Sequence, residues 1–182
     1  MLIGVAGPNA AGKGEVTGYL AQQGYRVLSL SDILRDTLRR EGVSETRERM
    51  IETGARLREE HGPGVLARQT LEKLGSDHDY AIDSIRHPAE VETLAGSARR
   101  FALVWVDADP RVRFERLRLR GRSGDPTRFE VFQELESREL ASADSAGQQL
   151  LAVKALADHV VHNDGSLATL QEQVAVWLSE LS

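Results

Sequence analysis

The sequence predicts an α/β fold with a parallel sheet, and three observations support this prediction. Short apolar runs alternate with longer amphipathic segments along the chain. The first apolar run leads into a glycine-rich loop at residues 7–14, and helix-forming residues follow directly. Polar residues stand where the apolar runs end. Because strands that alternate with helices are joined by right-handed crossovers, we expect a parallel sheet with helices on both faces.

Each element of this fold has its own signal in the sequence. Apolar runs predict five strands, at residues 1–6, 25–30, 80–83, 101–106 and 159–162. Gly24 ends the first helix, and Ser31 with Asp32 is expected to cap the second. Amphipathic spacing predicts helices at about 15–23, 31–40, 44–60, 65–74, 89–98, 110–120, 126–140, 148–157 and 167–181.

The composition argues against several classes of function. The chain of 182 residues has no cysteine, which excludes disulfides, cysteine-ligated zinc and thiol catalysis. Its formal charge of −5 argues against broad affinity for nucleic acid. No apolar run approaches the roughly 20 residues that span a bilayer, and the first strand lacks the basic flank of a signal peptide. We therefore expect a cytoplasmic protein, monomeric or homodimeric, that binds neither nucleic acid nor membranes.

The glycine-rich loop carries the most specific signal. Gly7 to Lys13 fits the pattern G-x-x-x-x-G-K, in the strand–loop–helix setting that this motif requires. Backbone N–H groups of such a loop, the helix N-terminus and the lysine together attract phosphates. Gly14 stands where a Ser or Thr normally supplies a hydroxyl to magnesium. The residues expected to bind ATP here are Gly7, Pro8, Asn9, Ala10, Ala11, Gly12, Lys13, Gly14 and Glu15.

Two acidic residues at strand ends are candidates for holding magnesium with ATP. Asp83 ends the third strand, and we expect it to bind the metal directly or through water. Ser84 follows it, where hydrolytic enzymes usually place a water-activating glutamate, and this favours transfer over hydrolysis. Asp32 follows the second strand and could bind the metal, orient an acceptor or accept its proton. Capping its own helix explains Asp32 equally well.

A basic cluster lies on the helix predicted at 110–120. Arg113, Arg116 and Arg120 share one face, while apolar residues including Leu119 are expected to pack elsewhere. Guanidinium groups stabilise transferring phosphates, so we expect catalytic roles for Arg116, Arg120 and Arg122, with a small lid at about 120–127. The alternative is a solvated helix face paired with carboxylates such as Glu115.

Other residues near strand ends are candidates for binding the two substrates. Asn163 and Gly165 follow the last strand, where backbone groups could meet an adenine edge, although a plain strand–helix turn explains them too. The five histidines show no metal-binding spacing. Three arginines flank the second and third strands and could hold the phosphate of an acceptor: Arg35, Arg56 and Arg86.

These segments, taken in order, resemble the nucleoside monophosphate kinase group of P-loop kinases over nearly the full chain. SDILR is similar to the acceptor-lining stretch of adenylate kinases, and DSIR to the segment after their third strand. ADHVVHNDGSL is similar to the turn that borders the adenine in dephospho-CoA kinases, and RLRLRGR occupies the place of the lid arginines in both. The overall likeness is to poorly characterised kinase-like proteins of bacteria and archaea.

The resemblance implies a P-loop nucleoside triphosphate hydrolase fold with strand order 2-3-1-4-5. It implies one domain over residues 1–182, with a helical acceptor-binding region at about 31–74. The expected activity is transfer of phosphate from ATP, with Mg²⁺, to a nucleoside or deoxynucleoside monophosphate. Phosphorylation of a hydroxyl, as in dephospho-CoA, remains an alternative in which Asp32 becomes the base. A non-catalytic ATP-binding regulatory module and an ATP hydrolase also remain open.

Overall fold

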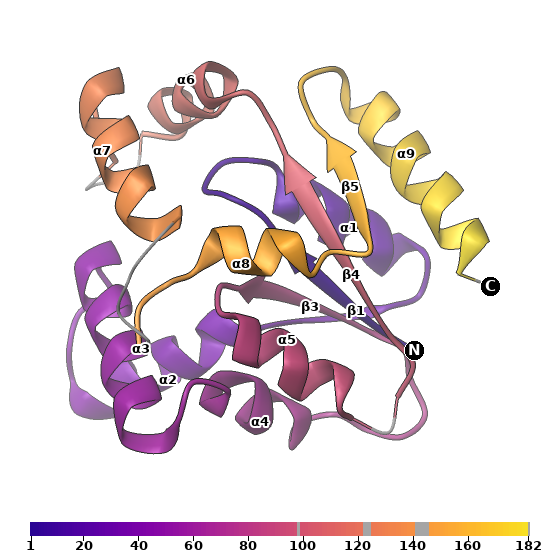
Figure 1. Cartoon of the computed structure of the whole chain (residues 1–182), viewed down its shortest axis with the longest axis horizontal. Coiled ribbons are helices and arrows are strands. Elements are labelled where there is room, and N and C mark those ends of the chain that lie inside the picture. The colour runs from indigo at the N-terminus through magenta and orange to yellow at the C-terminus, as the bar shows by residue number, and fades with distance from the viewer. Residues whose placement is uncertain (98, 122–124, 141–145, 182) are drawn as a thin grey trace.

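A five-stranded parallel sheet forms the centre of the computed structural model, which describes residues 1–97, 99–121, 125–140 and 146–181 (Figure 1). The strand order is β2-β3-β1-β4-β5, and each neighbouring pair is parallel. Fold class and strand order are therefore as predicted. The strands are β1 (Leu2–Ala6), β2 (Arg26–Ser29), β3 (Tyr80–Ile85), β4 (Phe101–Asp107) and β5 (His159–His162).

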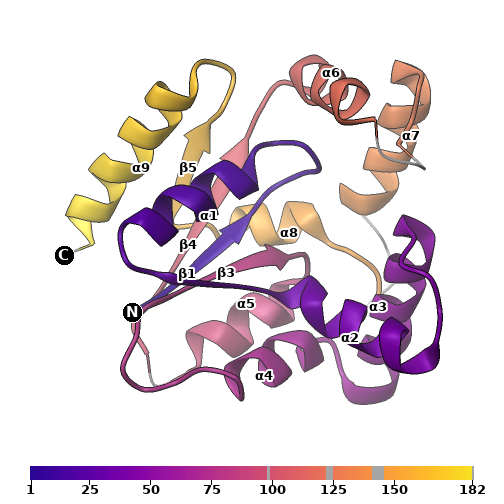
Figure 2. The same ribbon diagram turned by 180° about the vertical axis from the view of Figure 1, so that it is seen from behind.

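Helices cover both faces of this sheet. Helices α5 and α8 lie over the face that Figure 1 presents, and α1 and α9 lie over the opposite face, seen in Figure 2. None of the described helices combines the length and apolarity needed to cross a membrane. The helices are α1 (Lys13–Gln22), α2 (Leu30–Glu41), α3 (Arg47–His61), α4 (Val65–Leu71), α5 (Pro88–Ala95), α6 (Pro110–Arg120), α7 (Phe129–Leu140), α8 (Leu150–Ala155) and α9 (Leu167–Glu180).

The two faces of the sheet bury two separate apolar cores. Alternate residues of β4 divide between them: Trp105 packs into the core beneath α5 and α8, and Val104 into the core beneath α1 and α9. A third, smaller cluster joins α6 to α7 through Phe114 and Phe132, and Ala10 of the glycine-rich loop packs against it. The helices that follow β4 are thus fixed directly to the loop.

The second helix begins earlier than the sequence predicts. Leu30 is already helical, and the residue before it, Ser29, is the N-cap, with φ −126° and ψ 132°. The expectation that Ser31 and Asp32 cap this helix is therefore wrong. Asp32 lies in the first helical turn instead of in the loop between strand and helix.

The third strand continues beyond its predicted end at Asp83. It runs to Ile85, and its pairing with β1 shifts register between Val5 and Ala6, so that Ser84 is an extra residue in β3. Ser84 has φ 65°, a left-handed conformation that is rare for residues with a side chain. Such bulges re-aim side chains near active sites. Simple alternation would place Ile82 and Ile85 on opposite faces of the sheet. The bulge lets both pack in the same core.

Candidate nucleotide-binding site

The loop between β1 and α1 is shaped by two glycines that cannot be replaced without strain. Gly7 has φ 147°, and a Cβ atom there would collide with the carbonyl oxygen of Val106. Gly12 has φ 101°, and a Cβ atom there would collide with the side-chain amide of Asn163. Both positions therefore require glycine for conformation and for space.

The same loop presents backbone donors that none of the described residues uses. Gly12 is the N-cap of α1 and supplies no side-chain cap. Among the described residues, nothing accepts a hydrogen bond from the backbone N–H groups of Asn9, Ala10, Gly12 and Gly14. Such a concave group of N–H donors at a helix N-terminus is a binding site for phosphate. The loop thus has the donors that the motif predicts.

Lys13 bends back over this loop. Its ammonium group donates to the carbonyl oxygens of Gly7 and Pro8, each at 2.9 Å. The charge predicted to neutralise the terminal phosphates therefore lies at the loop itself. Two other members of the predicted set, Gly14 and Glu15, are exposed in the first turn of α1.

Asn163 and Arg116 brace the loop from outside. The buried side-chain amide of Asn163 donates to the carbonyl oxygen of Ala11 at 2.8 Å. The guanidinium of Arg116 donates to the carbonyl oxygen of Asn163 at 2.7 Å and lies 3.5 Å from the carbonyl oxygens of Ala10 and Ala11. Two predicted site residues from α6 and the β5–α9 turn therefore meet at the loop. Gly165 is exposed in the same turn.

The arginines of α6 divide into different roles. Arg113 is buried, donates to the carbonyl oxygen of Ala108 at 2.8 Å and pairs with Glu136 of α7, so it holds the two helices together. Arg120 pairs with Asp125 at 2.9 Å. Leu119, expected to be packed, is instead 88% exposed. Arg122, the remaining predicted catalytic arginine, and residues 123 and 124 of the predicted lid lie outside the described residues.

The residues around Asp83 fit a magnesium ion that is held mainly by phosphates and water. Asp83 is half-buried near the carboxyl end of β3, next to β1, and one of its carboxylate oxygens accepts the backbone N–H of Ser84. Mg²⁺ typically uses one or two carboxylates, substrate phosphates and several waters. No group of three or more acidic or histidine side chains gathers as a metal cage within the described ranges. A single carboxylate on the strand next to β1, which leads into the glycine-rich loop, matches the first pattern.

The predicted acceptor residues are separated into three places. Arg35 donates to Asp32 at 2.7 Å, within α2. Arg86, after β3, donates to the side-chain oxygen of Gln148 at 2.9 Å. Arg56 is exposed on α3 and pairs with Glu41 of α2 at 2.6 Å. The structure therefore joins Asp32 to Arg35, and it gives Arg56 a partner that ties the two helices together.

A buried ion pair near Arg86 escaped the sequence prediction. Arg58 of α3 donates to Glu90 of α5 at 2.9 Å, and both side chains are at least 95% buried. The second carboxylate oxygen of Glu90 accepts the backbone N–H groups of Arg86 and His87. One available signal was the sequence His87-Pro88-Ala89-Glu90, which has the spacing of a capping box.

A second pair, Asp107 with Lys154, lies at the end of β4. Their side chains are 2.7 Å apart. Burial alone would raise the pKa of Asp107, but the hydrogen bond and charge of Lys154, with the backbone N–H of Ala108, hold the pKa below its ordinary range. Lys154 comes from α8, 47 residues later in the chain, so no local pattern predicts this contact.

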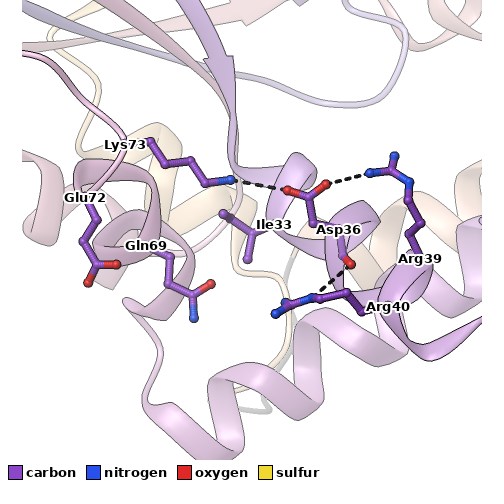
Figure 3. A pocket seen from close by; sticks show the side chains of 7 residues that line it. All are labelled: Ile33, Asp36, Arg39, Arg40, Gln69, Glu72 and Lys73. Carbon is purple, nitrogen blue, oxygen red and sulfur yellow. Dashed lines mark hydrogen bonds and ion pairs between the residues drawn. The ribbon is translucent and has the colours of Figure 1, made fainter.

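A groove of about 640 Å³ between α2 and α4 lies apart from these residues (Figure 3). Asp36 lies between Lys73 and Arg39 in it, and the hydrogen bond from Lys73 with both positive charges holds the pKa of Asp36 below its ordinary range. No residue predicted to act in the site lines the groove. Its lining is Ile33, Asp36, Arg39, Arg40, Gln69, Glu72 and Lys73.

Comparisons with known proteins agree with the parallel α/β fold described above. A family model described as an AAA domain matches residues 3–141. A UPF0200 protein of Hyperthermus butylicus is 37% identical over 185 residues, which cover all of this chain and 95% of the relative. A shikimate kinase from Bacteroides thetaiotaomicron is similar in structure, with a TM-score of 0.64 and 14% identity over all of this chain and 98% of that one. A gluconokinase from Sinorhizobium meliloti 1021 has a TM-score of 0.56 and 15% identity over 98% of this chain and 91% of that one. The structural likeness shows a P-loop kinase-like fold.

Proposed function

The chain belongs to the UPF0200 family, and we propose that it is an ATP-dependent kinase of a small molecule, with a nucleoside or deoxynucleoside monophosphate as acceptor. One observation carries the proposal. The loop from Gly7 to Gly14 combines unused backbone N–H donors with the ammonium group of Lys13 at the N-terminus of α1. This combination suits the β- and γ-phosphates of a nucleoside triphosphate.

The neighbouring residues supply what phosphoryl transfer needs beyond binding. Lys13 would exchange its contacts with loop carbonyls for phosphate oxygens. Arg116, already against the loop, would neutralise charge that develops during transfer, together with Arg120 and Arg122. Asp83 would hold Mg²⁺, which neutralises phosphate charge when bound; Asp32 is the second candidate ligand. Asn163 fixes the loop, and its backbone with that of Gly165 would border the adenine.

The acceptor would lie between α2 and the end of β3. Arg35, which contacts Asp32, and Arg86, which follows β3 and contacts Gln148, would bind the acceptor phosphate, with Asp32 orienting it. Arg56 would contribute from α3 only after leaving Glu41. The helical segment at about 31–74 would then be the acceptor-binding region.

A second candidate acceptor is a hydroxyl group, as in dephospho-CoA. One oxygen of Asp32 accepts from Arg35, and its other oxygen has no partner within the described part of the chain. An ionised carboxylate with an unused oxygen is suited to accept a hydroxyl proton. This observation keeps the hydroxyl acceptor as an alternative to the monophosphate.

The test is incubation with labelled ATP and Mg²⁺ against nucleoside monophosphates, deoxynucleoside monophosphates, dephospho-CoA, shikimate and gluconate. A labelled product other than orthophosphate supports the kinase. Free phosphate alone would indicate a hydrolase, and ATP binding without turnover would indicate a regulatory module.

Replacement of the loop lysine shows whether the loop is responsible. We expect Lys13→Ala to lower transfer by orders of magnitude, because the terminal phosphates lose a direct positive charge. Lys73→Ala is a matched control, since Lys73 pairs with exposed Asp36 away from the loop. Unchanged turnover in Lys13→Ala would contradict the assignment of the loop.

A further inference from the structure

Hydrogen bonds connect three serines at the ends of β2 and β3, and we name Ser29, Ser31 and Ser84 the serine chain. The hydroxyl of Ser29 donates to that of Ser84 at 2.9 Å and lies 2.8 Å from that of Ser31. The guanidinium of Arg35 donates to Ser31 at 2.8 Å. The serine chain therefore begins at a predicted acceptor residue and ends at the residue after Asp83.

The direction of these bonds leaves one donor unused. A guanidinium can only donate, so Ser31 accepts from Arg35, and the hydroxyl of Ser31 can donate its own hydrogen bond to Ser29. Ser29 then donates to Ser84. Among the described residues, no group accepts the hydroxyl proton of Ser84. Bonds in such a chain polarise one another, which makes the final O–H a stronger donor.

Ser84, at the end of the serine chain, and Ser29, in its middle, each have a distinctive backbone position. Ser84 has φ 65°, where glycine would be unstrained and a side chain is disfavoured. Ser29 is the N-cap of α2 but makes no side-chain cap bond; its hydroxyl donates to Ser84. A residue with a strained backbone and a helix N-cap without a side-chain cap bond are thus joined by the same hydroxyl contact.

We propose that the Ser84 hydroxyl is a specificity-determining donor to an anionic oxygen of the acceptor, pre-aligned by Ser29, Ser31 and Arg35. The inference rests on the proposed function. It specifies that the acceptor presents an anionic oxygen to the hydroxyl of Ser84. Ser84 stands between Asp83, the candidate magnesium ligand, and Arg86, a candidate acceptor residue. A phosphate group is the occupant that this position favours, because Arg35 donates into the serine chain and Arg86 follows Ser84 by two residues in the sequence.

Two substitutions at Ser84 separate chemistry from backbone strain. Ser84→Gly and Ser84→Ala both remove the hydroxyl, but only glycine relieves the positive φ. We therefore expect Ser84→Gly to melt roughly 2–4 °C above Ser84→Ala. The loss of a hydrogen bond to a charged group should lower kcat/KM for the phosphorylated acceptor about tenfold to a hundredfold in both.

A binding measurement makes the test independent of the acceptor's identity. The phosphate loop is first saturated with a non-hydrolysable ATP analogue and Mg²⁺, and the melting temperature is then followed with increasing inorganic phosphate. We expect phosphate to raise the melting temperature of the wild type and of Ser179→Ala, a control on exposed α9. Both Ser84 variants should lose this rise to the same extent.

Several results would overturn the inference. One is a phosphate-dependent rise in melting temperature that persists in both Ser84 variants. Another is loss of this rise only in Ser84→Ala, the less stable variant, which would trace the loss to backbone strain. Absence of the rise in the wild type would equally overturn it. If no acceptor is phosphorylated at all, the proposed kinase activity fails, while the phosphate titration still decides the role of Ser84.

Ser29 supplies a further check as a positioning residue. Ser29→Ala removes the donor to Ser84 without removing a helix cap, since none is made. We expect a several-fold weaker response to phosphate, with Ser29→Thr restoring it. An unchanged response in Ser29→Ala would remove the serine chain from the proposal.

Discussion

The side-chain amide of Asn163 donates to the carbonyl oxygen of Ala11 at 2.8 Å, and this buried contact joins the turn after β5 to the phosphate loop. The two residues are 152 positions apart in the sequence. The contact also occupies the space that a side chain at Gly12 would need. The shape of the loop therefore depends on the last strand as well as on its own glycines.

Asn163→Ala should weaken ATP binding and lower stability together. The change removes the 2.8 Å donor to the carbonyl oxygen of Ala11 and leaves, among the described side chains, only the longer contact from Arg116, which costs about 1–3 kcal/mol. Calorimetric titration with ATP and thermal unfolding measure the two effects. Gly12→Ala should lower stability and ATP affinity more in the wild type than in the Asn163→Ala background. The shorter side chain at position 163 removes the collision with a Cβ atom at position 12 but not the strain of φ 101°. Strictly additive effects in this cycle would contradict the contact.

Arg116→Ala should reduce turnover strongly, and Arg118→Ala should not. Arg116 contacts the loop and the carbonyl oxygen of Asn163, whereas Arg118 pairs with Glu115 on the exposed side of the same helix. We expect a loss in kcat of about a hundredfold or more for Arg116→Ala, as for other residues that stabilise transition-state charge. Steady-state kinetics with the accepted substrate measures it. Equal losses in the two variants would indicate a general effect of helix charge.

Gly14→Ser should be tolerated and should lower the Mg²⁺ concentration required for turnover. A Cβ atom at Gly14 meets no atom within 4 Å, so nothing in the packing requires glycine. The new hydroxyl would stand where this motif usually offers a magnesium ligand. The measurement is the half-saturating Mg²⁺ concentration at fixed ATP, with Gly18→Ser, an open position later in α1, as control. A higher Mg²⁺ requirement would contradict the placement.

Lys154→Gln should flatten the acid dependence of stability. The pKa of Asp107 is below its ordinary value of 3.8, so its ionised form stabilises the fold above that value. This stabilisation is lost as the pH falls from the unfolded pKa through the lower folded pKa. Without Lys154 the folded pKa moves up, so the variant should be less stable at pH 7 and should change less between about pH 5 and 2. Thermal unfolding across this range measures it; parallel curves would contradict the pairing.

The sequence predicts well what depends on local pattern. The five parallel strands and the glycine-rich loop follow from the alternation of elements and from residues 7–13, whereas the strand order followed from the family resemblance. The boundary at Asp32 was wrong because a serine three residues earlier, Ser29, already has cap geometry, and both residues favour caps. Leu119 is exposed because it lies about 200° around α6 from buried Leu117, off the face that Leu117 shares with Phe114.

Contacts that join distant segments were not predictable from spacing. Arg113 and Arg116 share a helix face by periodicity, yet Arg113 is buried against Glu136 and Arg116 lies at the loop. The bulge at Ser84 depends on the register of β3 against β1, which the residues of β3 alone do not encode. Pairs such as Asp107 with Lys154 form only once α8 has folded onto the sheet.

The buried pair of Arg58 and Glu90 limits how the helical region can move during a catalytic cycle. Glu90 binds the second half of α3 and the first residues after β3 with the same carboxylate, so separating them would strand a charge away from water. The outer bond between Arg56 and Glu41 is exposed and opens at little cost. A rearrangement of the helical region would therefore leave the second half of α3 attached to the start of α5, and α2 would separate from α3 by breaking the bond between Arg56 and Glu41.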